Sequence, residues 1–334
     1  MEFTRADWRR LAELRERFLA AEVRDTNSPL PPYWADERDF EIYDATFAQR
    51  IGWKFRAVMR ELQLRGRLPS GALVVDWGCG TGIAAREYCA VAGAQAGQRF
   101  VLFDRSREAT DFARMKLLEV HPELEVSTDR LSPTIEPDVL LISHVLDELG
   151  DEDRHQLLNL VRRSRAVVWV EAGSRATSRK LCQLRDELLA HFDVVAPCTH
   201  SVKCGVLAAG QSANWCHHFA RAPAEAFTSA HWRTFADTLG IDLRSLPYSF
   251  IALERRSENS PKTAANARFL GRPRMMKGRA MLDVCDESGV REMSLLQRTD
   301  RALFRRLDDA AGELLLFSIT ADGRRITAIE PRAQ

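Results

Sequence analysis

Apolar residues recur at helical spacing near the start of the chain, over residues 5–24 and again from about residue 36 to residue 65. A proline-rich segment, 28–32, separates the two stretches and ends the first predicted helix. Lys and Arg residues occupy the faces of the second helix that carry no apolar stripe. We interpret these charges as the solvent-exposed side of a helix rather than as an RNA contact, and we expect a helical region over residues 1–70.

From Gly71 onward, short apolar runs rich in β-branched residues alternate with helical segments. Such alternation is typical of an α/β domain built on a doubly wound parallel sheet. The predicted strands cover 73–75, 99–103, 124–126, 139–142, 166–171, 192–196 and 250–253, and the predicted helices include 83–88, 109–120 and 178–191. We place this α/β domain at residues 71–255, with a cysteine-rich insertion at about 197–220.

A glycine-rich turn follows the first predicted strand, where residues 76–82 read D-W-G-C-G-T-G. Glycine at every second position lets the backbone approach a ligand closely and adopt a positive φ. The helix that follows offers free N–H groups and the positive end of its dipole. The spacing is neither the G-x-G-x-x-G of dinucleotide binders nor the lysine-bearing phosphate loop. The pattern indicates a ligand-binding turn, and a tight turn without a ligand is the alternative.

This form of the turn resembles the first motif of the Rossmann-like S-adenosylmethionine (SAM) methyltransferases. In that family the loop lies against the methionine and ribose parts of SAM, and an acid at the end of the second strand holds the ribose hydroxyls. Here Asp104 directly follows the strand predicted at 99–103. Open α/β sheets bind ligands outside the carboxyl ends of their strands, where the fourth strand is followed by Ser143. The resemblance implies SAM binding by Asp76, Gly78, Gly80, Gly82, Asp104 and Ser143, with Asp129 a weak candidate for an adenine contact.

The sequence contains no evident catalytic group after the fourth strand, where Ser143 is followed by His144. His144 could act as a base with Asp147 or Glu148 as its partner, but we favour a capping role for its side chain. No N-P-P-Y motif, the signature of amino-group methylation, follows this strand. Cys198 lies too late in the chain to be the nucleophile of a cytosine-5 methyltransferase, which follows the fourth strand. Catalytic residues therefore stay unassigned.

Three cysteines, Cys198, Cys204 and Cys216, fall within nineteen positions of polar, glycine-bearing sequence. Buried free cysteines normally occur singly among aliphatic neighbours, as we expect for Cys182. Grouped thiolates in a loop instead favour zinc or an iron–sulfur cluster. A fourth ligand is available locally from His200, His217 or His218, which would complete a zinc site, or from the distant Cys285.

Several motifs together are similar to those of a methyltransferase-like family associated with the mitochondrial small ribosomal subunit, and of its bacterial relatives. They are P-C-x-H-x-x-x-C from Pro197, W-C-H from Trp215, P-Y-S-F from Pro247 and K-G-R-A-M-L-D-V-C from Lys277. The resemblance implies a SAM-methyltransferase fold that acts in small-subunit assembly or translation and contacts the subunit or its rRNA. It also implies a 4Fe-4S cluster on Cys198, Cys204, Cys216 and Cys285. Thr199 stands in place of the usual proline and His218 adds a second histidine, so zinc stays the alternative metal.

The stretch from Arg255 to Arg279 holds eight Lys and Arg residues and one acid, a local charge of +7 in a chain whose net charge is +1. Pro and Gly residues prevent a long helix here, and clustered arginines in extended sequence neutralise phosphates and stack on splayed bases. A solvated linker is the alternative interpretation. A small, basic, β-rich unit over 256–334 is predicted by alternating apolar segments at 280–284, 290–295 and 314–319.

Composition and charge limit the cellular compartments and the classes of function that we expect for this chain. The first twenty residues are charged throughout, which argues against a secretory leader or a membrane span, and the seven cysteines then indicate a reduced, cytoplasmic interior. Three functions follow: a SAM-binding, metal-bearing factor of the small ribosomal subunit, an active SAM-dependent rRNA methyltransferase with a structural zinc site, or a methyltransferase of proteins or small molecules. The lack of an evident catalytic group favours the first, and the basic stretch disfavours the third.

Overall fold

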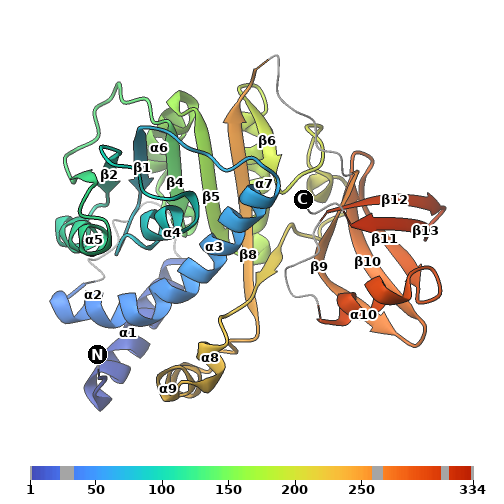
Figure 1. Ribbon diagram of the computed structural model, residues 1–334, viewed down its shortest axis with the longest axis horizontal. Coiled ribbons are helices and arrows are strands. Elements are labelled where there is room, and N and C mark those ends of the chain that lie inside the picture. Colours follow the sequence, from blue (N-terminus) through green and yellow to red (C-terminus); the bar gives the residue numbers. More distant parts are fainter. Residues whose placement is uncertain (1, 23–33, 258–265, 310–315, 332–334) are drawn as a thin grey trace. The chain divides into compact units, whose positions relative to one another are not determined.

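The structure is a computed structural model that describes residues 2–22, 34–257, 266–309 and 316–331 (Figure 1). The proline-rich segment 28–32 and part of the basic stretch lie outside the described residues. The chain forms two compact units. The first comprises Met1–Met59, Pro69–Val167 and Arg221–Leu246, and the second comprises Arg60–Leu68, Val168–Ala220 and Pro247–Gln334.

Four parallel strands form the sheet of the first unit, in the order β3-β2-β1-β4. They are β1 (Leu73–Trp77), β2 (Arg99–Phe103), β3 (Glu125–Ser127) and β4 (Val139–Ser143). In register, Val75 of β1 lies between Val101 of β2 and Leu140 of β4. The side chains of these three residues are buried, as expected for parallel strands whose two faces are both covered.

A helix follows each of the three longer strands of this sheet (Figure 1). These helices are α4 (Ile83–Ala92) after β1, α5 (Arg107–Val120) after β2 and α6 (Asp151–Arg163) after β4. The helix α5 begins where the Ser106 side chain accepts a hydrogen bond from the amide of Ala109. This repeated passage from parallel strand to helix confirms the predicted α/β, Rossmann-like class.

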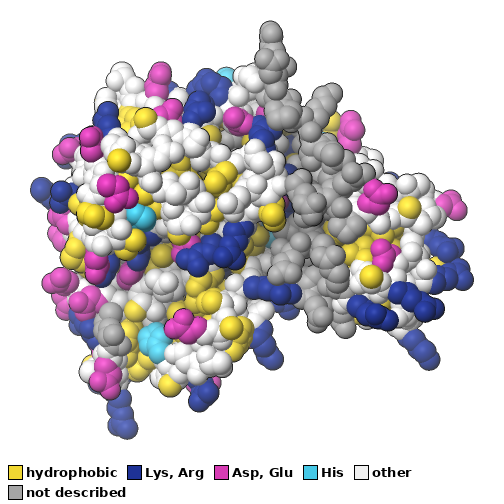
Figure 2. Space-filling view, viewed as in Figure 1, with side chains coloured by type: hydrophobic (Ala, Val, Ile, Leu, Met, Phe, Trp, Pro, Cys, Tyr) yellow, Lys and Arg dark blue, Asp and Glu magenta, His cyan; other side chains and the backbone are white. Residues whose placement is uncertain are grey.

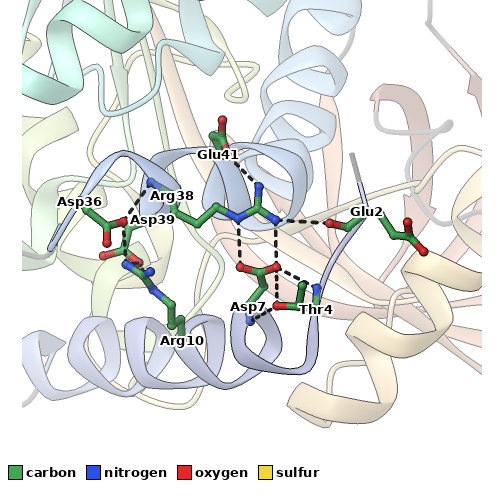
Figure 3. Close-up of polar contacts among 8 residues, drawn as sticks. All are labelled: Glu2, Thr4, Asp7, Arg10, Asp36, Arg38, Asp39 and Glu41. Atoms are coloured by element: carbon green, nitrogen blue, oxygen red, sulfur yellow. Dashed lines mark hydrogen bonds and ion pairs between the residues drawn. The ribbon is translucent and has the colours of Figure 1, made fainter.

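Ion pairs join the first two helices, α1 (Arg5–Glu22) and α2 (Glu37–Tyr43), as Figure 3 shows. Arg38 of α2 pairs with Asp7 of α1 at 2.8 Å, and Arg10 of α1 pairs with Asp39 of α2 at 2.8 Å. Hydrogen bonds from Arg38 hold the pKa of the Asp7 carboxyl well below its usual range. Because both acids are buried, these contacts fix α2 against α1.

The remaining helices of the first unit pack through aromatic contacts. A π-helix (Asp44–Ala48) leads into α3 (Gln49–Leu64), and α8 (Glu225–Thr228) is followed by α9 (Ala230–Leu239). Trp53 of α3 packs against Trp232 of α9, with ring centroids 4.8 Å apart. Of the described helices, none is both long enough and apolar enough to span a membrane.

The second unit contains its own strands and one long helix. Strand β5 (Ala166–Ala172) enters it from the first unit and is followed by α7 (Arg175–Leu188), β6 (Phe192–Ala196), β7 (His218–Ala220) and β8 (Leu246–Arg255). The long strand β8 lies between β5 and β6, and it also pairs with β7. β6 and β8 run antiparallel, with Val194 opposite Leu253.

Five further strands of the second unit close into a barrel in the order β10-β11-β13-β12-β9. They are β9 (Ala267–Met276), β10 (Arg279–Asp286), β11 (Gly289–Leu296), β12 (Leu316–Asp322) and β13 (Arg325–Pro331), and α10 (Arg301–Asp309) connects β11 to β12. In the barrel core, Phe269 stacks on Phe317 with ring centroids 4.0 Å apart. Leu303 and Leu307 of α10 are buried in the same core.

Candidate functional site

The glycine-rich turn between β1 and α4 has left-handed backbone at every glycine. Gly78, Gly80 and Gly82 have φ angles of 70°, 50° and 77°, which side-chain-bearing residues rarely adopt. A Cβ on Gly78 would lie 2.4 Å from a methyl carbon of Val145, and a Cβ on Gly82 would lie 2.9 Å from that of Ala113. At Gly80 no atom lies within 4 Å of the Cβ position. Packing therefore excludes side chains at the first and third glycines, whereas the second leaves open space.

Asp76 lies at the carboxyl end of β1 and is fully buried. Its Oδ2 accepts a hydrogen bond from the amide of Ala85 in α4 at 3.1 Å, and its Oδ1 has no partner among the described residues. Burial raises the pKa of Asp76 to about 7, and the neighbouring Asp104 carboxylate adds to the rise. A buried acceptor without a hydrogen bond is costly, so Oδ1 marks a position where a ligand N–H or O–H would be stabilised.

Asp104 follows β2 directly and holds the glycine turn in place. Its Oδ2 accepts a hydrogen bond from the amide of Gly80, and its Oδ1 accepts one from the amide of Ser106, both at 3.0 Å. Burial raises the pKa of this carboxyl. Because a carboxylate offers about four acceptor positions, Asp104 keeps capacity for further hydrogen bonds.

A cavity of about 1010 Å³ lies at the carboxyl ends of β1, β2 and β4, the edge of the sheet where open α/β folds bind ligands. Five of the six predicted cofactor-binding residues line it: Asp76, Gly78, Gly80, Asp104 and Ser143. Gly82 is not among the lining residues and faces α5 instead. Asp129 does not line the cavity either; its carboxylate accepts a hydrogen bond from Ser127.

Sequence reasoning missed three aromatic side chains that line the same cavity, Trp34, Phe40 and Phe112. The rings of Trp34 and Phe40 lie 4.7 Å apart, and Phe40 stacks on Phe112 at 5.7 Å. Phe40 belongs to α2, which the ion pairs of Figure 3 hold against α1. Phe112 lies far along the chain from Trp34 and Phe40, so no local pattern could have identified the wall. It provides a flat apolar surface of the kind that binds a heterocycle.

His144 follows β4 in a left-handed backbone conformation, with a φ of 55°. Its Nδ1 lies 3.1 Å from Ser143 Oγ, and its Nε2 lies 3.3 Å from Lys54 Nζ. Burial, together with the positive charges of Lys54 and Arg50, lowers the pKa of His144 well below its usual value. The ring is therefore neutral, and since an ammonium group only donates, Nε2 accepts from Lys54. This engagement of its basic nitrogen supports the capping interpretation rather than a role as base.

The second unit gathers five cysteines in one region: Cys182, Cys198, Cys204, Cys216 and Cys285. The thiol of Cys182 lies within hydrogen-bonding reach of both Cys204 and Cys216. Aliphatic side chains also pack against these thiols, among them Val206 and Leu270. The expectation that Cys182 lies apart from the other cysteines is therefore wrong.

The thiols differ in how readily they ionise. Hydrogen bonding from Cys182 lowers the pKa of Cys204 to about 7, whereas burial raises that of Cys198 to about 11. Burial also raises the pKa of Cys285. The Cys204 amide donates to the Asp186 carboxylate, with the nitrogen 3.0 Å from Oδ2. Cys204 is thus the thiol most easily converted to a thiolate, the form that binds metals.

Backbone contacts hold the cysteine-bearing segments together within this unit. A Cβ on Gly205 would lie 2.7 Å from the Cα of Gly289, so the chain after Cys204 touches the turn between β10 and β11. Arg185 of α7 donates hydrogen bonds to the carbonyls of His200 at 2.9 Å and Val202 at 2.5 Å. These contacts fix the chain between the first two predicted ligands and bring it to the turn that follows Cys285.

Two of the three candidate histidines lie beside cysteines. His218 Nε2 is 3.7 Å from Cys216 Sγ, and His200 Nε2 is 4.0 Å from Cys285 Sγ. The third, His217, stacks on Trp215 with ring centroids 4.3 Å apart. In the part of the chain that the structure describes, no three His, Cys, Asp or Glu side chains converge as a metal-holding group. The four predicted thiol ligands are gathered in one region without being arranged around a common point.

The position of Arg268 differs from what the sequence analysis predicts for the basic stretch. Its side chain, in β9, is 2% exposed and pairs with Glu61 at 2.5 Å. Arg65 pairs with the same carboxylate at 2.5 Å. Arg268 also donates a hydrogen bond to the carbonyl of Pro197 at 3.2 Å. Counting this arginine among the RNA-facing charges is wrong, because it belongs to a buried ion-pair network beside the cysteine segment.

Comparison with known proteins identifies one family and several distant structures. Residues 42–312 match the family described as mitochondrial small ribosomal subunit Rsm22, and no curated protein matches the chain. Magnesium protoporphyrin IX methyltransferase (ChlM) from Synechocystis PCC 6803 is 15% identical at a TM-score of 0.37, over 77% of this chain and 100% of that chain. A SAM-dependent methyltransferase from Aquifex aeolicus is 13% identical at a TM-score of 0.37, over 49% and 92%. Precorrin-6y C5,15-methyltransferase from Geobacter metallireducens GS-15 is 15% identical at a TM-score of 0.36, over 60% and 87%.

Proposed function

Because this chain belongs to the family of the mitochondrial small ribosomal subunit protein Rsm22, we propose that it is a SAM-binding protein that acts on the small ribosomal subunit or its rRNA. The observation that carries the SAM part is the cavity of the first unit, which is lined by a left-handed glycine turn and by the unpartnered Oδ1 of Asp76. The subunit part rests on family membership.

The charges around the cavity suit SAM, which carries its transferable methyl group on a positively charged sulfur. Eight acidic residues and one arginine line the cavity, so the lining favours a cationic ligand. Asp104 would accept hydrogen bonds from the ribose hydroxyls, Asp76 would accept one through Oδ1, and the open side of Gly80 would admit the ligand to the backbone. The wall formed by Trp34, Phe40 and Phe112 would pack against the adenine.

The lining favours binding over catalysis. His144 is the histidine and Cys79 the cysteine of the cavity wall, and they are the first side chains to consider as a base and as a nucleophile. The basic nitrogen of His144 accepts a hydrogen bond from Lys54, and burial raises the pKa of Cys79 well above its usual value. We therefore propose a ribosome-associated factor in which SAM is a bound ligand, with methyl transfer to rRNA as the alternative.

We further propose that Cys198, Cys204, Cys216 and Cys285 hold a 4Fe-4S cluster. The donor set suits the group, because four thiols of one region are buried or half-buried beside the guanidinium of Arg185, which favours thiolates. The cluster would tie β10 to the chain around Cys198 and Cys204, so metal binding would contribute folding free energy to this unit. Iron and sulfide analysis of protein purified without oxygen tests the assignment. Brown protein with iron and acid-labile sulfide is expected, and colourless protein with stoichiometric zinc would establish the alternative.

Equilibrium dialysis with labelled SAM tests the cofactor proposal. Gly80→Ala places a methyl group at the open side of the turn and should weaken SAM binding at least tenfold. The matched control is Gly97→Ala, which also replaces a left-handed glycine with no atom within 4 Å, but outside the cavity lining. Equal affinities in the two variants would contradict the assignment. Label transfer to small-subunit RNA would identify a methyltransferase, and co-sedimentation with small subunits without transfer would identify a binding factor.

A further inference from the structure

The barrel of the second unit has the strand order of an OB-fold. Numbered from β9 to β13 as strands 1 to 5, it closes in the order 1-2-3-5-4, with strands 3 and 5 parallel and a helix between strands 3 and 4. In OB-folds, strands 2 and 3 and the loops 1–2 and 4–5 bind oligonucleotides or oligosaccharides. The equivalent surface here consists of β10, β11 and the turns at Lys277–Gly278 and Gly323–Arg324.

Both turns lie beside the second half of β11. The amide of Gln297, just after β11, donates to the carbonyl of Gly278 at 2.9 Å. The amide of Ser294 donates to the carbonyl of Arg324 at 2.8 Å. One strand end is therefore flanked by the two turns that bind ligands in this barrel type.

Four exposed cations, which we call the loop cations, stand at these turns: Lys277, Arg279, Arg324 and Arg325. None of them makes an ion pair with another described residue. The acid nearest in register is Asp322, opposite Arg325 across the β12–β13 turn. Figure 2 shows several Lys and Arg side chains on the surface of the barrel. The turns thus present unneutralised positive charge.

The middle of the same surface is closer to neutral. A hollow of about 500 Å³ has Arg274, Arg291 and Arg324 in its lining together with Asp283 and Glu292, and Gln211 and Asn214 of the chain before β7 border it on one side. Arg274 pairs with Glu292 and lies 3.8 Å from Asp283. Positive charge is therefore available mainly at the flanking turns, which suits a chain of phosphates that passes from one turn to the other.

We propose that this barrel binds single-stranded RNA, with the backbone phosphates held by the loop cations. The proposal deepens the rRNA partner proposed above and rests on it for the identity of the RNA. Strands β10 and β11 contain no aromatic residue, so the stacking that reads or grips bases in many OB-folds is absent from these two strands. Binding should therefore be insensitive to base sequence and strongly dependent on salt.

Fluorescence anisotropy of the full-length protein with a labelled oligouridine, over a salt series, tests the proposal. Four phosphate contacts predict a slope of about −3 in a plot of log affinity against log salt, because each contact on a single strand contributes about −0.7. Arg324→Gln/Arg325→Gln should reduce the slope to about half and weaken binding about tenfold at low salt. The matched control is Arg130→Gln/Arg233→Gln, which removes the same charge from exposed arginines of the first unit and should change neither quantity.

Equal losses in the two double variants would overturn the proposal, and so would tighter binding of a duplex RNA of the same length. Co-sedimentation of the same variants with small subunits separates the two levels of the argument. Wild-type protein that binds oligouridine through the loop cations but does not sediment with subunits would refute the proposed ribosomal partner and support the barrel site. Wild-type protein that sediments but whose oligouridine binding ignores the loop cations would refute the barrel site alone.

Discussion

The carboxylate of Asp104, at the end of β2, holds the amide of Gly80 in the turn after β1, with Oδ2 3.0 Å from the amide nitrogen. The second oxygen holds the amide of Ser106, the residue that caps α5. One side chain thus connects the glycine turn with the next strand and its helix. The same side chain lines the cavity, so positioning of the turn and ligand binding depend on it together.

Asp104→Asn should weaken SAM binding about tenfold to a hundredfold and lower the free energy of unfolding by about 1 to 2 kcal/mol. The amide nitrogen can only donate, so one backbone N–H loses its acceptor and the charge facing the ribose disappears. Equilibrium dialysis and urea unfolding measure the two effects. Asp129→Asn, an exposed acid outside the cavity lining, should change neither. An unchanged SAM affinity in Asp104→Asn would contradict the assigned role.

The raised pKa of Asp76 predicts how the free energy of unfolding depends on pH in protein without SAM. Its pKa is raised from 3.8 to about 7, so between these values the folded protein holds a proton that the unfolded chain has released. The free energy of unfolding should therefore fall as pH rises through this window, by at most about 1.4 kcal/mol per pH unit, and level off above about 7.

The Asp76→Asn variant has no carboxyl group to titrate at this position. Urea unfolding of wild type and of the variant between pH 5 and 8 therefore separates the contribution of Asp76 from that of all other titrating groups. The stability of wild type relative to the variant should decline up to about pH 7 and then stay constant. A difference that does not vary with pH would show that Asp76 is ionised in the folded protein at pH 5.

Arg268→Gln should be strongly destabilising, by about 3 to 5 kcal/mol, because it leaves the buried Glu61 carboxylate with fewer partners. Arg274→Gln is the matched control on the same strand, since its side chain is exposed and its ion pair lies at the surface. That variant should cost less than about 1 kcal/mol. Urea unfolding measures both. If Glu61→Gln/Arg268→Gln is no more stable than Arg268→Gln, the loss does not come from the unpaired carboxylate.

The features that the sequence predicts correctly are encoded locally. The strand, the acid and the three glycines of the turn all lie within residues 73–82, so their spacing alone indicates left-handed backbone and a ligand-binding edge. The three longer parallel strands of the first unit, β1, β2 and β4, each contain a run of at least three apolar residues, which is why their positions follow from composition.

The features that sequence reasoning misses depend on distant partners. Trp34 and Phe112 belong to one wall of the cavity, with Phe40 in contact with both, only because α2 and α5 pack together. The sequence alone predicts Arg268 to be a surface charge. In the structure it is buried, because it forms an ion pair with Glu61, which lies 207 positions away in the chain. Strand β9 alternates arginines with apolar residues over its second half. Because the sequence analysis takes these arginines as part of a basic extended stretch, it does not predict a strand there. Cys182 is far from the other cysteines in sequence, but the position of α7 in the structure brings its thiol beside Cys204 and Cys216.

Cys182 provides the sharpest test of the metal proposal, because its closeness to Cys204 and Cys216 makes it an alternative to the four proposed ligands. Its thiol reaches both Cys204 and Cys216, yet it lies on the buried face of helix α7. Cys198 and Cys204 instead lie in the segment 197–204, which itself contains neither helix nor strand. A segment of that kind can adjust around a cluster more easily than a packed helix can. Cys182→Ser should therefore keep the iron content of wild type, and Cys198→Ser and Cys204→Ser should each lose most of it.

Iron and sulfide per chain, measured on anaerobically purified variants together with visible absorbance, decide between the ligand sets. Cys89→Ser controls for the loss of a buried thiol, since that cysteine lies in the first unit. Loss of iron in Cys182→Ser with retention in Cys198→Ser would move the site to Cys182, Cys204, Cys216 and Cys285. That outcome would place the metal on the helix. The chain around Cys198 would then be held without a metal, by hydrogen bonds that include those from Arg185, Arg268 and Arg65 to its carbonyls.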